Sequence, residues 1–430
     1  MSKILLVILD GLGDRQHAAL GGRTPLEAAV TPNLDALATA GVCGTMYSLG
    51  PGRAPTSFQA HYALFGYPAE EYPGRGLLEA IGEGMPPAPG EIALRASLLT
   101  AEESADGFTV THRPDPRRGE STLAGVDLDG EFDGVRVRFV HTDARQGLVF
   151  VSADEPLSHH VTDADPFREG LPVLAVQATE EAPDQAAAAR TAGALNAWML
   201  EARERLAAVP GLEGDFMVTK WAGSSHVAQP FTERYGMAGA MVASGPLYAG
   251  LAAVVGMRHV ETGCDLRDPR TDLETRLAAS LTLLAGDIDF VHAHTKAPDH
   301  AAHKKNPAGK RDVIEQLDAA LGVLVRERVW ERDIIVAITA DHATPSAGPL
   351  YHSGEAVPLL VLGGAAGADD VKAFGERTCT RGLLGTLRGS DLMPVLLNAA
   401  DRCVSTGERF TRARQWAQPR AEDLVALRRP

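Results

Sequence analysis

The residues best suited to chemistry lie late in the chain, in the segment 339–354. Asp341 and His342 follow Ile334–Ile338, an apolar, β-branched run typical of a strand buried on both faces, and His352 comes after a short loop. In parallel α/β sheets the ligand crevice lies beyond the carboxyl ends of the strands. An acid and two imidazoles at such a place suit a ligand or a metal ion. The sequence therefore predicts a functional site here, provided that other strands supply partners.

Two other segments supply partners of the same kind. Asp10 follows the apolar run Ile4–Leu9, while Asp299 and His303 follow a predicted strand at 288–293 and lie four apart on the helix that a proline opens. Each has a purely structural alternative: an Asx turn for the first aspartate and a helix-surface contact for the second pair. Their common position after predicted strands favours a metal site.

A hydroxyl group comes from the segment Gly50–Tyr67. Its Gly- and Pro-rich loop delivers Thr56 and Ser57 to the predicted start of a helix. Such a hydroxyl is either an N-cap that accepts a backbone N–H or a nucleophile that uses the positive helix end to hold a phosphate. Arg53 and Arg75, in Gly-rich loops on either side, are candidate contacts for a phosphate or carboxylate.

Seven oxygen- or nitrogen-bearing side chains thus follow strands or open helices of one predicted sheet. Together they would supply two divalent metal ions with about three protein ligands each and a bridging hydroxyl, as two-metal phosphoryl chemistry requires. Asp and His donors accept Mn or Zn and, more weakly, Mg. The seven residues are Asp10, Ser57, Asp299, His303, Asp341, His342 and His352.

The bulk composition is that of a soluble globular protein with about two domains. The chain has 430 residues, of which 45% are hydrophobic, and no apolar run reaches membrane-spanning length. Its net charge of -15 disfavours nucleic acid or an anionic membrane as a partner. The four cysteines are scattered without a CxxC pair, which fits a cytoplasmic location. The oligomeric state is left open.

Hydrophobic patterning predicts an α/β core interrupted by a smaller α+β domain. Short alternating runs at Ile92–Leu99, Val135–Val140, Gly147–Val151 and Leu174–Gln177 predict strands and hairpins, and an Ala-rich segment from Pro183 predicts a long helix. We therefore expect a core domain of residues 1–90 and 179–430 and an inserted domain of residues 91–178. Arginines are numerous in the insert, which suggests an anion-facing surface, although a solvated strand face has the same pattern; they are Arg95, Arg113, Arg117, Arg118, Arg136 and Arg138.

The order of these motifs resembles one known family. The Asp-Gly after the first strand, the APxS and AHxxxFGY motifs of the segment 54–67, HxKxxDxxxH at 294–303 and TxDHxTP…HSG at 339–354 resemble the archaeal type of cofactor-independent phosphoglycerate mutase. That family belongs to the alkaline-phosphatase superfamily. Similar blocks at 72–85, 161–167 and 381–402 extend the resemblance over nearly the whole chain.

The resemblance implies a fold and a set of roles. The fold would be alkaline-phosphatase-like, a mostly parallel sheet flanked by helices. One metal site would comprise Asp10, Ser57, Asp341 and His342, and the other Asp299, His303 and His352.

The same resemblance implies a mechanism. Ser57 would take the phosphoryl group and return it to another hydroxyl of the same small phosphorylated carboxylate, and Lys296 would help to hold the substrate. The inserted domain would close over the substrate and exclude water, so that transfer outcompetes hydrolysis.

Several substrate-side positions depart from the family pattern. Phe58 stands where an acidic residue is expected, the segments 112–120 and 144–146 differ, and Lys220 and Trp221 replace an Arg and a small residue. We take Arg53, Arg75, Arg95, Arg117, Arg118 and Lys220 as candidate substrate contacts.

These departures leave the substrate open. A phosphoglycerate mutase is the default expectation. The alternatives are a phosphohydrolase, a mutase acting on another phosphorylated or phosphonate metabolite, and a non-catalytic protein on a retired enzyme fold.

Overall fold

The computed structural model describes residues 2–68, 71–114, 123–224, 228–263, 265–403 and 423–429. The chain divides into two compact units. Unit 1 comprises residues 1–72, 228–245 and 252–430, and unit 2 comprises residues 73–227 and 246–251.

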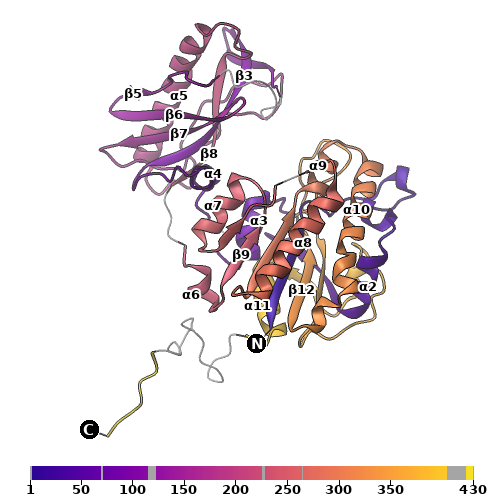
Figure 1. The fold of residues 1–430 in the computed structure, drawn as a ribbon. Helices are drawn as coiled ribbons and strands as arrows, with labels where there is room; N and C mark the ends of the chain where they lie inside the picture. The colour runs from indigo at the N-terminus through magenta and orange to yellow at the C-terminus, as the bar shows by residue number, and fades with distance from the viewer. Residues whose placement is uncertain are drawn as a thin grey trace. The chain divides into compact units, whose positions relative to one another are not determined.

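Unit 1 is built around an eight-stranded sheet (Figure 1). Its central strand, with the sequence KILLVIL, is buried at six of seven positions and is flanked on both sides by parallel neighbours, which explains its unbroken apolar run. In spatial order the strands are β10 (Arg258–Val260), β9 (Gly239–Val242), β11 (Phe290–Thr295), β1 (Lys3–Leu9), β12 (Ile334–Thr339), β13 (Val357–Leu362), β2 (Val42–Tyr47) and β14 (Gly385–Arg388).

One strand of this sheet runs against the others. β13 pairs antiparallel with both β12 and β2, whereas every other neighbouring pair is parallel. The amino end of β13 therefore lies at the edge of the sheet where the other strands have their carboxyl ends. The predicted mostly parallel α/β sheet is confirmed, with this one reversal.

Helices flank the sheet of unit 1 (Figure 1). Several begin with a proline in the first turn after a capping residue: Asp268 and Asn306 each accept a hydrogen bond from a backbone N–H three residues on. Within the described residues, no helix is long and apolar enough to cross a membrane. The α-helices are α1 (Pro25–Ala28), α2 (Pro32–Ala40), α3 (Ser57–Leu64), α6 (Phe231–Tyr235), α8 (Pro269–Ala285), α9 (Ala297–His303), α10 (Pro307–Arg326) and α11 (Gly389–Ala399), and α7 (Pro246–Val254) is shared with unit 2.

Among the described residues, unit 2 contains a six-stranded antiparallel sheet, two whole helices and the first part of α7. The long strand β3 pairs with β7 and β8 along its first half and with β4 along its second half. The strands are β3 (Ile92–Ser104), β4 (Gly107–His112), β5 (Gly130–Phe132), β6 (Val135–Asp143), β7 (Gln146–Ala153) and β8 (Phe216–Ser224), and the helices are α4 (Arg75–Gly82) and α5 (Gln185–Ala207).

The core of unit 2 explains why it extends beyond the predicted range of residues 91–178. Trp198 and Leu195 of the Ala-rich helix α5 are buried in one apolar cluster with Leu94 and Val149 of the sheet. β8 completes the sheet by pairing with β3. The helix and the last strand therefore fold with the insert, and the division lies at residues 73–227 and 246–251 instead.

A second difference concerns Leu174–Gln177, where a strand was expected and none is found. The backbone N–H of Leu174 donates to Ala164, and that of Val176 donates to the side chain of Asn196 on α5. These backbone groups are satisfied by a loop and by a helix side chain, so that no neighbouring strand is needed.

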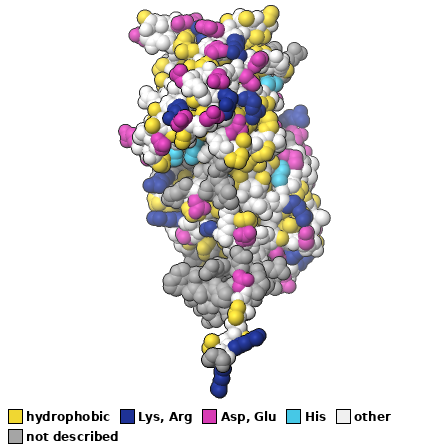
Figure 2. Space-filling model, turned by 90° about the vertical axis from the view of Figure 1, so that its left-hand side faces the viewer, with side chains coloured by type: hydrophobic (Ala, Val, Ile, Leu, Met, Phe, Trp, Pro, Cys, Tyr) yellow, Lys and Arg dark blue, Asp and Glu magenta, His cyan; other side chains and the backbone are white. Residues whose placement is uncertain are grey.

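Acidic and basic side chains share the surface. On the face shown in Figure 2, Lys and Arg side chains lie among Asp and Glu side chains and are not gathered in one area.

Candidate metal centre

The carboxyl-end edge of the unit 1 sheet collects the predicted ligands. The strand register explains why these ligands lie together. In β1, Leu9 lies opposite Thr295 of β11, and Ile8 lies opposite Thr339 of β12. The residues that follow these strands therefore emerge side by side. We call this place the ligand edge, and its members are Asp10, Asp299, Asp341, His342 and His352.

His352 reaches the ligand edge by a different route. It precedes β13 instead of following a strand, and it is brought here because β13 runs antiparallel to its neighbours. Ser57 arrives from the loop after β2, as the first residue of α3. Thr56 is the N-cap of this helix, so that the cap position and the predicted nucleophile are adjacent residues.

Donor atoms at the ligand edge form two overlapping sets. In the first set, donor atoms of Asp10, Asp341 and His342 lie within 4.8 Å of one another. In the second, the same holds for Asp299, His342 and His352. His342 therefore belongs to both sets, which the sequence did not indicate.

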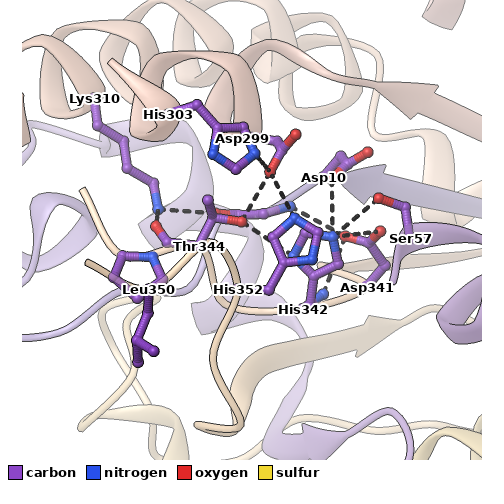
Figure 3. A network of polar contacts seen from close by, with 12 residues as sticks. Asp10, Ser57, Asp299, His303, Lys310, Asp341, His342, Thr344, Leu350 and His352 are labelled. Carbon is purple, nitrogen blue, oxygen red and sulfur yellow. Dashed lines mark hydrogen bonds and ion pairs between the residues drawn. The ribbon is translucent and has the colours of Figure 1, made fainter. Parts of the chain in front are cut away.

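The remaining predicted ligands lie beside these sets. Ser57 Oγ is 3.0 Å from His342 Nε2. His303 Nε2 is 3.1 Å from Asp299 Oδ1, one helical turn away on α9. Figure 3 shows both side chains turned toward the ligand edge.

Two glycines allow neighbouring loops of the ligand edge to approach one another closely. Gly11 has a φ of +66°, and a Cβ there would lie 2.5 Å from Thr344 Oγ1 and 2.9 Å from the Asp299 backbone. A Cβ on Gly354 would lie 2.3 Å from the backbone of Gly52. The Asp-Gly and Ser-Gly pairs of the motifs are thus required by close contact between the loops.

Hydrogen bonds fix the tautomers of two imidazoles (Figure 3). Thr344 Oγ1 donates to Asp299 Oδ1, so that it accepts from Nδ1 of His342 at 3.1 Å. Nε2 of His342 is then the lone-pair nitrogen, 3.4 Å from Asp10 Oδ1 and 3.3 Å from Asp341 Oδ2.

The second imidazole repeats this arrangement. Nδ1 of His352 donates to the carbonyl of Pro55 at 2.9 Å, which leaves the lone pair of the neutral ring on Nε2, 3.5 Å from Asp299 Oδ1. A lone pair facing a carboxylate oxygen is repulsive unless a cation lies between them. Holding the second ring nitrogen through an N–H donor is the usual arrangement of a metal-binding histidine.

Burial and mutual repulsion perturb the carboxylates. Burial, together with the charges of Asp341 and Asp299, raises the pKa of Asp10 well above its usual value. Burial raises the pKa of Asp341 to about 7, and Asp299 adds to the shift. Burial opposes ionisation of Asp299 too, but the contact with His303 and the charge of Lys296 hold its pKa well below the usual range.

The ring of His342 is held neutral. Burial lowers its pKa well below the usual value. A neutral imidazole is the form that binds metals.

These features fit divalent cations. Three buried carboxylates and two imidazole lone pairs converge within a few ångströms, and Asp341 Oδ2 is buried without a hydrogen-bond donor among the described residues. Oxygen and nitrogen donors of this kind suit Mn or Zn. The residues present therefore fit the metal group that the sequence predicted, although the division of ligands between two ions stays a prediction.

Lys296 and Arg53 lie near this site in different ways. Lys296 is the half-buried N-cap of α9, and its charge acts on all three carboxylates. Arg53 is exposed, in a loop whose Gly52 N–H donates to the Gly354 carbonyl.

Three further candidate substrate contacts, Arg75, Arg95 and Lys220, lie in unit 2, in what we call the cation cluster. It consists of Arg75, Arg95, Arg113, Lys220, Glu79 and Asp165. Arg117 and Arg118 lie outside the described residues.

Buried carboxylates pair with the cations of the cluster. Glu79 binds Arg75 Nε at 2.6 Å and Arg95 Nη1 at 3.0 Å. Asp165 accepts two hydrogen bonds of 2.9 Å from Arg113 and one of 2.6 Å from Lys220. Four cations thus contact two carboxylates.

Two aromatic residues border the cation cluster. Trp221 and Phe167 both have a φ of +60°, a conformation that side chains of this size rarely adopt, and their rings stack at a centroid distance of 6.0 Å. The Arg75 guanidinium lies 3.7 Å from the Trp221 ring, and Lys220 Nζ lies 4.7 Å from it.

Three functional neighbours were not found from the sequence. His294 contacts Asp10 Oδ2 at 2.9 Å, Thr344 links Asp299 to His342, and Lys310 is fully buried behind the ligand edge. The first two lie within the quoted motifs, so that their positions carried a signal. Lys310 lies in a run of charged residues typical of a solvated helix, which gave none.

Comparison with known proteins gives one family. The model of the metalloenzyme superfamily matches residues 2–399. Phosphoglycerate mutase 2 of Methanocaldococcus jannaschii, a 2,3-bisphosphoglycerate-independent enzyme, is 35% identical over 99% of this chain and 99% of its own. The corresponding Methanopyrus kandleri enzyme is 36% identical over 94% of this chain and 98% of its own.

Solved structures agree with this result. A protein from Pyrococcus horikoshii superposes with a TM-score of 0.75 and 29% identity, covering 94% of this chain and 99% of that one. The cofactor-independent phosphoglycerate mutase of Thermoplasma acidophilum superposes with a TM-score of 0.62 and 28% identity, covering 93% and 100%.

Proposed function

Because the chain belongs to the metalloenzyme superfamily and, within it, to the 2,3-bisphosphoglycerate-independent phosphoglycerate mutases, we propose that it is a metal-dependent isomerase that interconverts 3-phosphoglycerate and 2-phosphoglycerate. The observation that carries this proposal is the ligand edge. Its buried carboxylates, and the His352 lone pair that faces Asp299, are costly to maintain without cations. The reaction itself is inferred from the family relationship, which extends over the whole chain.

The proposal includes two divalent metal ions. Asp10, Ser57, Asp341 and His342 would hold one, and Asp299, His303 and His352 the other, with His342 near both. When bound, such ions stabilise negative charge on phosphoryl oxygens and favour ionisation of a coordinated hydroxyl. Manganese, zinc or magnesium would serve, and a cytoplasmic location is the expected setting.

Ser57 is the proposed nucleophile. Its Oγ attacks the phosphorus of the substrate, the bond from phosphorus to the substrate oxygen breaks, and that oxygen takes up a proton. The neighbouring hydroxyl of the same glycerate then attacks the phosphoserine, which releases the Ser57 hydroxyl. Lys296 would steady the anionic substrate, because its charge already acts on the ligand edge.

The cation cluster supplies candidates for binding a second anionic group. Arg75, Arg95 and Lys220 are held in place by buried carboxylates. Guanidinium groups with fixed geometry suit a carboxylate. We include these three residues and Arg53 as proposed substrate contacts.

The aromatic border of the cation cluster favours a second candidate substrate. Lys220 and Trp221 stand where the family pattern has an Arg and a small residue. Trp221 and Phe167 adopt strained backbone conformations beside Lys220. This substitution is consistent with a phosphorylated or phosphonate carboxylate that differs from phosphoglycerate. The metal chemistry and the role of Ser57 would be the same.

One experiment separates these outcomes. Metal-loaded protein is incubated with 3-phosphoglycerate, and 2-phosphoglycerate and inorganic phosphate are followed together by ³¹P NMR. The proposal predicts isomer without free phosphate. Phosphate release would identify a phosphohydrolase, and absence of both products would favour the alternative substrate.

A further inference from the structure

Lys310 on α10 has a fully buried side chain. Its Nζ donates to three backbone carbonyls, those of Gly11 at 2.8 Å, Gly13 at 2.9 Å and Thr344 at 2.9 Å. It also donates to Asp14 Oδ2 at 3.1 Å. Four oxygens thus surround one ammonium group, and we call them the oxygen cage.

The oxygen cage has more acceptors than its lysine has protons. An ammonium group carries three N–H donors, so that four contacts of similar length cannot all be separate, well-aligned hydrogen bonds. The arrangement is instead that of carbonyl oxygens replacing the hydration shell of a monovalent cation. Asp14 balances the charge, and the Lys310 charge lowers the pKa of Asp14 against the opposing effect of burial.

The cage joins the segments that carry the ligand edge. Gly11, whose carbonyl lies in the cage, donates its N–H to Asp341 Oδ1 at 3.1 Å. Thr344, whose carbonyl also lies in the cage, uses its hydroxyl to link Asp299 and His342 (Figure 3). One ammonium group therefore holds together the loops after β1 and β12.

Without the ammonium group, the cage oxygens would face one another. Three carbonyl dipoles and the Asp14 carboxylate are directed at the same point, and carbonyl oxygens cannot bond to one another. The loops would separate, and the separation would move Asp341 and Thr344. Metal ligands tolerate little displacement, because affinity depends on the atoms that orient them.

We propose that Lys310 is a built-in monovalent cation, a positioning residue that sets the geometry of the ligand edge, and that removing its side chain leaves a site for free ammonium or potassium. The proposal rests on the metal sites of the proposed function. It does not depend on which substrate the protein uses.

The test compares Lys310→Ala with the wild type in a buffer containing only tetramethylammonium, which is too large for the cage. Mn²⁺ affinity is measured by calorimetric titration, and thermal unfolding is measured on the metal-free protein. We expect Lys310→Ala to bind Mn²⁺ at least about 10-fold more weakly. Added ammonium, methylammonium or potassium chloride should restore both the affinity and the unfolding temperature, while the wild type should not respond.

Two control variants make the readout specific. Lys310→Met fills the space without charge, so that it should lose affinity and gain nothing from ammonium. Lys305 is an exposed neighbour that donates to the carbonyls of Pro345 and Leu350, and Lys305→Ala should show no ammonium dependence. The proposal would be overturned if Lys310→Ala bound Mn²⁺ as tightly as the wild type. It would also be overturned if Lys310→Ala folded but none of the three cations restored its Mn²⁺ affinity.

A double variant tests the proposal in case Lys310→Ala does not fold. If Lys310→Ala folds only with ammonium present, the proposal stands. If it folds under neither condition, Asp14→Asn combined with Lys310→Met removes both charges, and weakened Mn²⁺ binding by this folded protein supports the positioning role. Wild-type affinity in that double variant would refute it. Absence of Mn²⁺ binding by the wild type would refute the proposed function instead, and cation-dependent unfolding of Lys310→Ala would still test the cage.

Discussion

The ligand edge of unit 1 and the cation cluster of unit 2 both bury several charged groups, but only one of them is balanced from within. At the ligand edge, three carboxylates lie together, and the pKa values of Asp10 and Asp341 are raised by burial and by mutual repulsion. In the cation cluster, each carboxylate lies between two cations. The charges of Arg75 and Arg95 outweigh the opposing effect of burial, so that the pKa of Glu79 is lowered.

This difference distinguishes a site that requires an added ion from a framework that is complete by itself. Removing a carboxylate should weaken the cation cluster, because it strands buried cations. Removing a carboxylate from the ligand edge should relieve repulsion between the remaining carboxylates in the metal-free protein. The opposite signs make the comparison testable.

The largest expected effect is on turnover at the ligand edge. Ser57→Ala removes the proposed nucleophile and should lower kcat by a factor of at least about 10⁴, judged from other enzymes that lose a nucleophile. Mn²⁺ affinity should fall much less, since the aspartates and histidines remain. Steady-state kinetics and calorimetry measure the two quantities.

A neighbouring hydroxyl provides the control for that variant. Thr56→Ala removes the N-cap side chain of α3, whose Oγ1 donates to Gln59 Oε1 at 2.9 Å, and should cost at most about 1 kcal/mol of stability while most of the activity survives. Substantial turnover by Ser57→Ala would rule out the nucleophile assignment.

The next effect is on the stability of unit 2. Asp165→Asn leaves Lys220 and Arg113 without their carboxylate, and should lower the free energy of unfolding by about 3 to 5 kcal/mol. Denaturant unfolding followed by Trp fluorescence measures it. Asp154→Asn, which removes an exposed pair with Arg136, should change stability by less than about 1 kcal/mol. Equal effects of the two variants would contradict the account of the cation cluster.

A smaller effect of opposite sign is expected at the ligand edge. Asn in place of Asp341 can still accept from the N–H groups of Gly11 and His342 through its oxygen. Asp341→Asn should therefore stabilise the metal-free protein at pH 8 by on the order of 2 kcal/mol, because it removes a buried like charge. Thermal unfolding in a chelator measures this, and destabilisation would mean that repulsion at the edge is already compensated.

The smallest predicted effect is on pH dependence. The folded pKa of Asp341 is about 7, against 3.8 for the unfolded chain, so that the folded state binds more protons between these values. This carboxyl should therefore make the metal-free protein less stable as pH rises from about 4 to 7. The difference in unfolding free energy between wild type and Asp341→Asn should grow steadily over that window. A difference that does not vary with pH would show that this carboxyl titrates normally.

Much of the ligand edge could be predicted from sequence because strand ends carry local signals. Apolar runs located β1, β11 and β12, and the residues after them emerge at one edge whenever strands are parallel. His352 was found only through its motif, since nothing local shows that β13 is reversed. The dual position of His342 depends on side-chain geometry that spacing does not encode.

The parts that were missed depend on contacts distant in sequence. Lys310 resembles a surface lysine until the loops after β1 and β12 surround it. The extent of unit 2 depends on β8 pairing with β3 across more than a hundred residues. Leu174–Gln177 has the composition of a strand, but its backbone is satisfied by Ala164 and Asn196.

The most direct test of the central claim is a count of bound ions. Metal-free wild type, Asp341→Asn and Asp165→Asn are each dialysed against Mn²⁺, and the bound metal is measured by elemental analysis. The account predicts two ions per chain for the wild type and for Asp165→Asn, and at most one for Asp341→Asn. A wild type that binds no metal, or an Asp341→Asn variant that binds as much as the wild type, would contradict it.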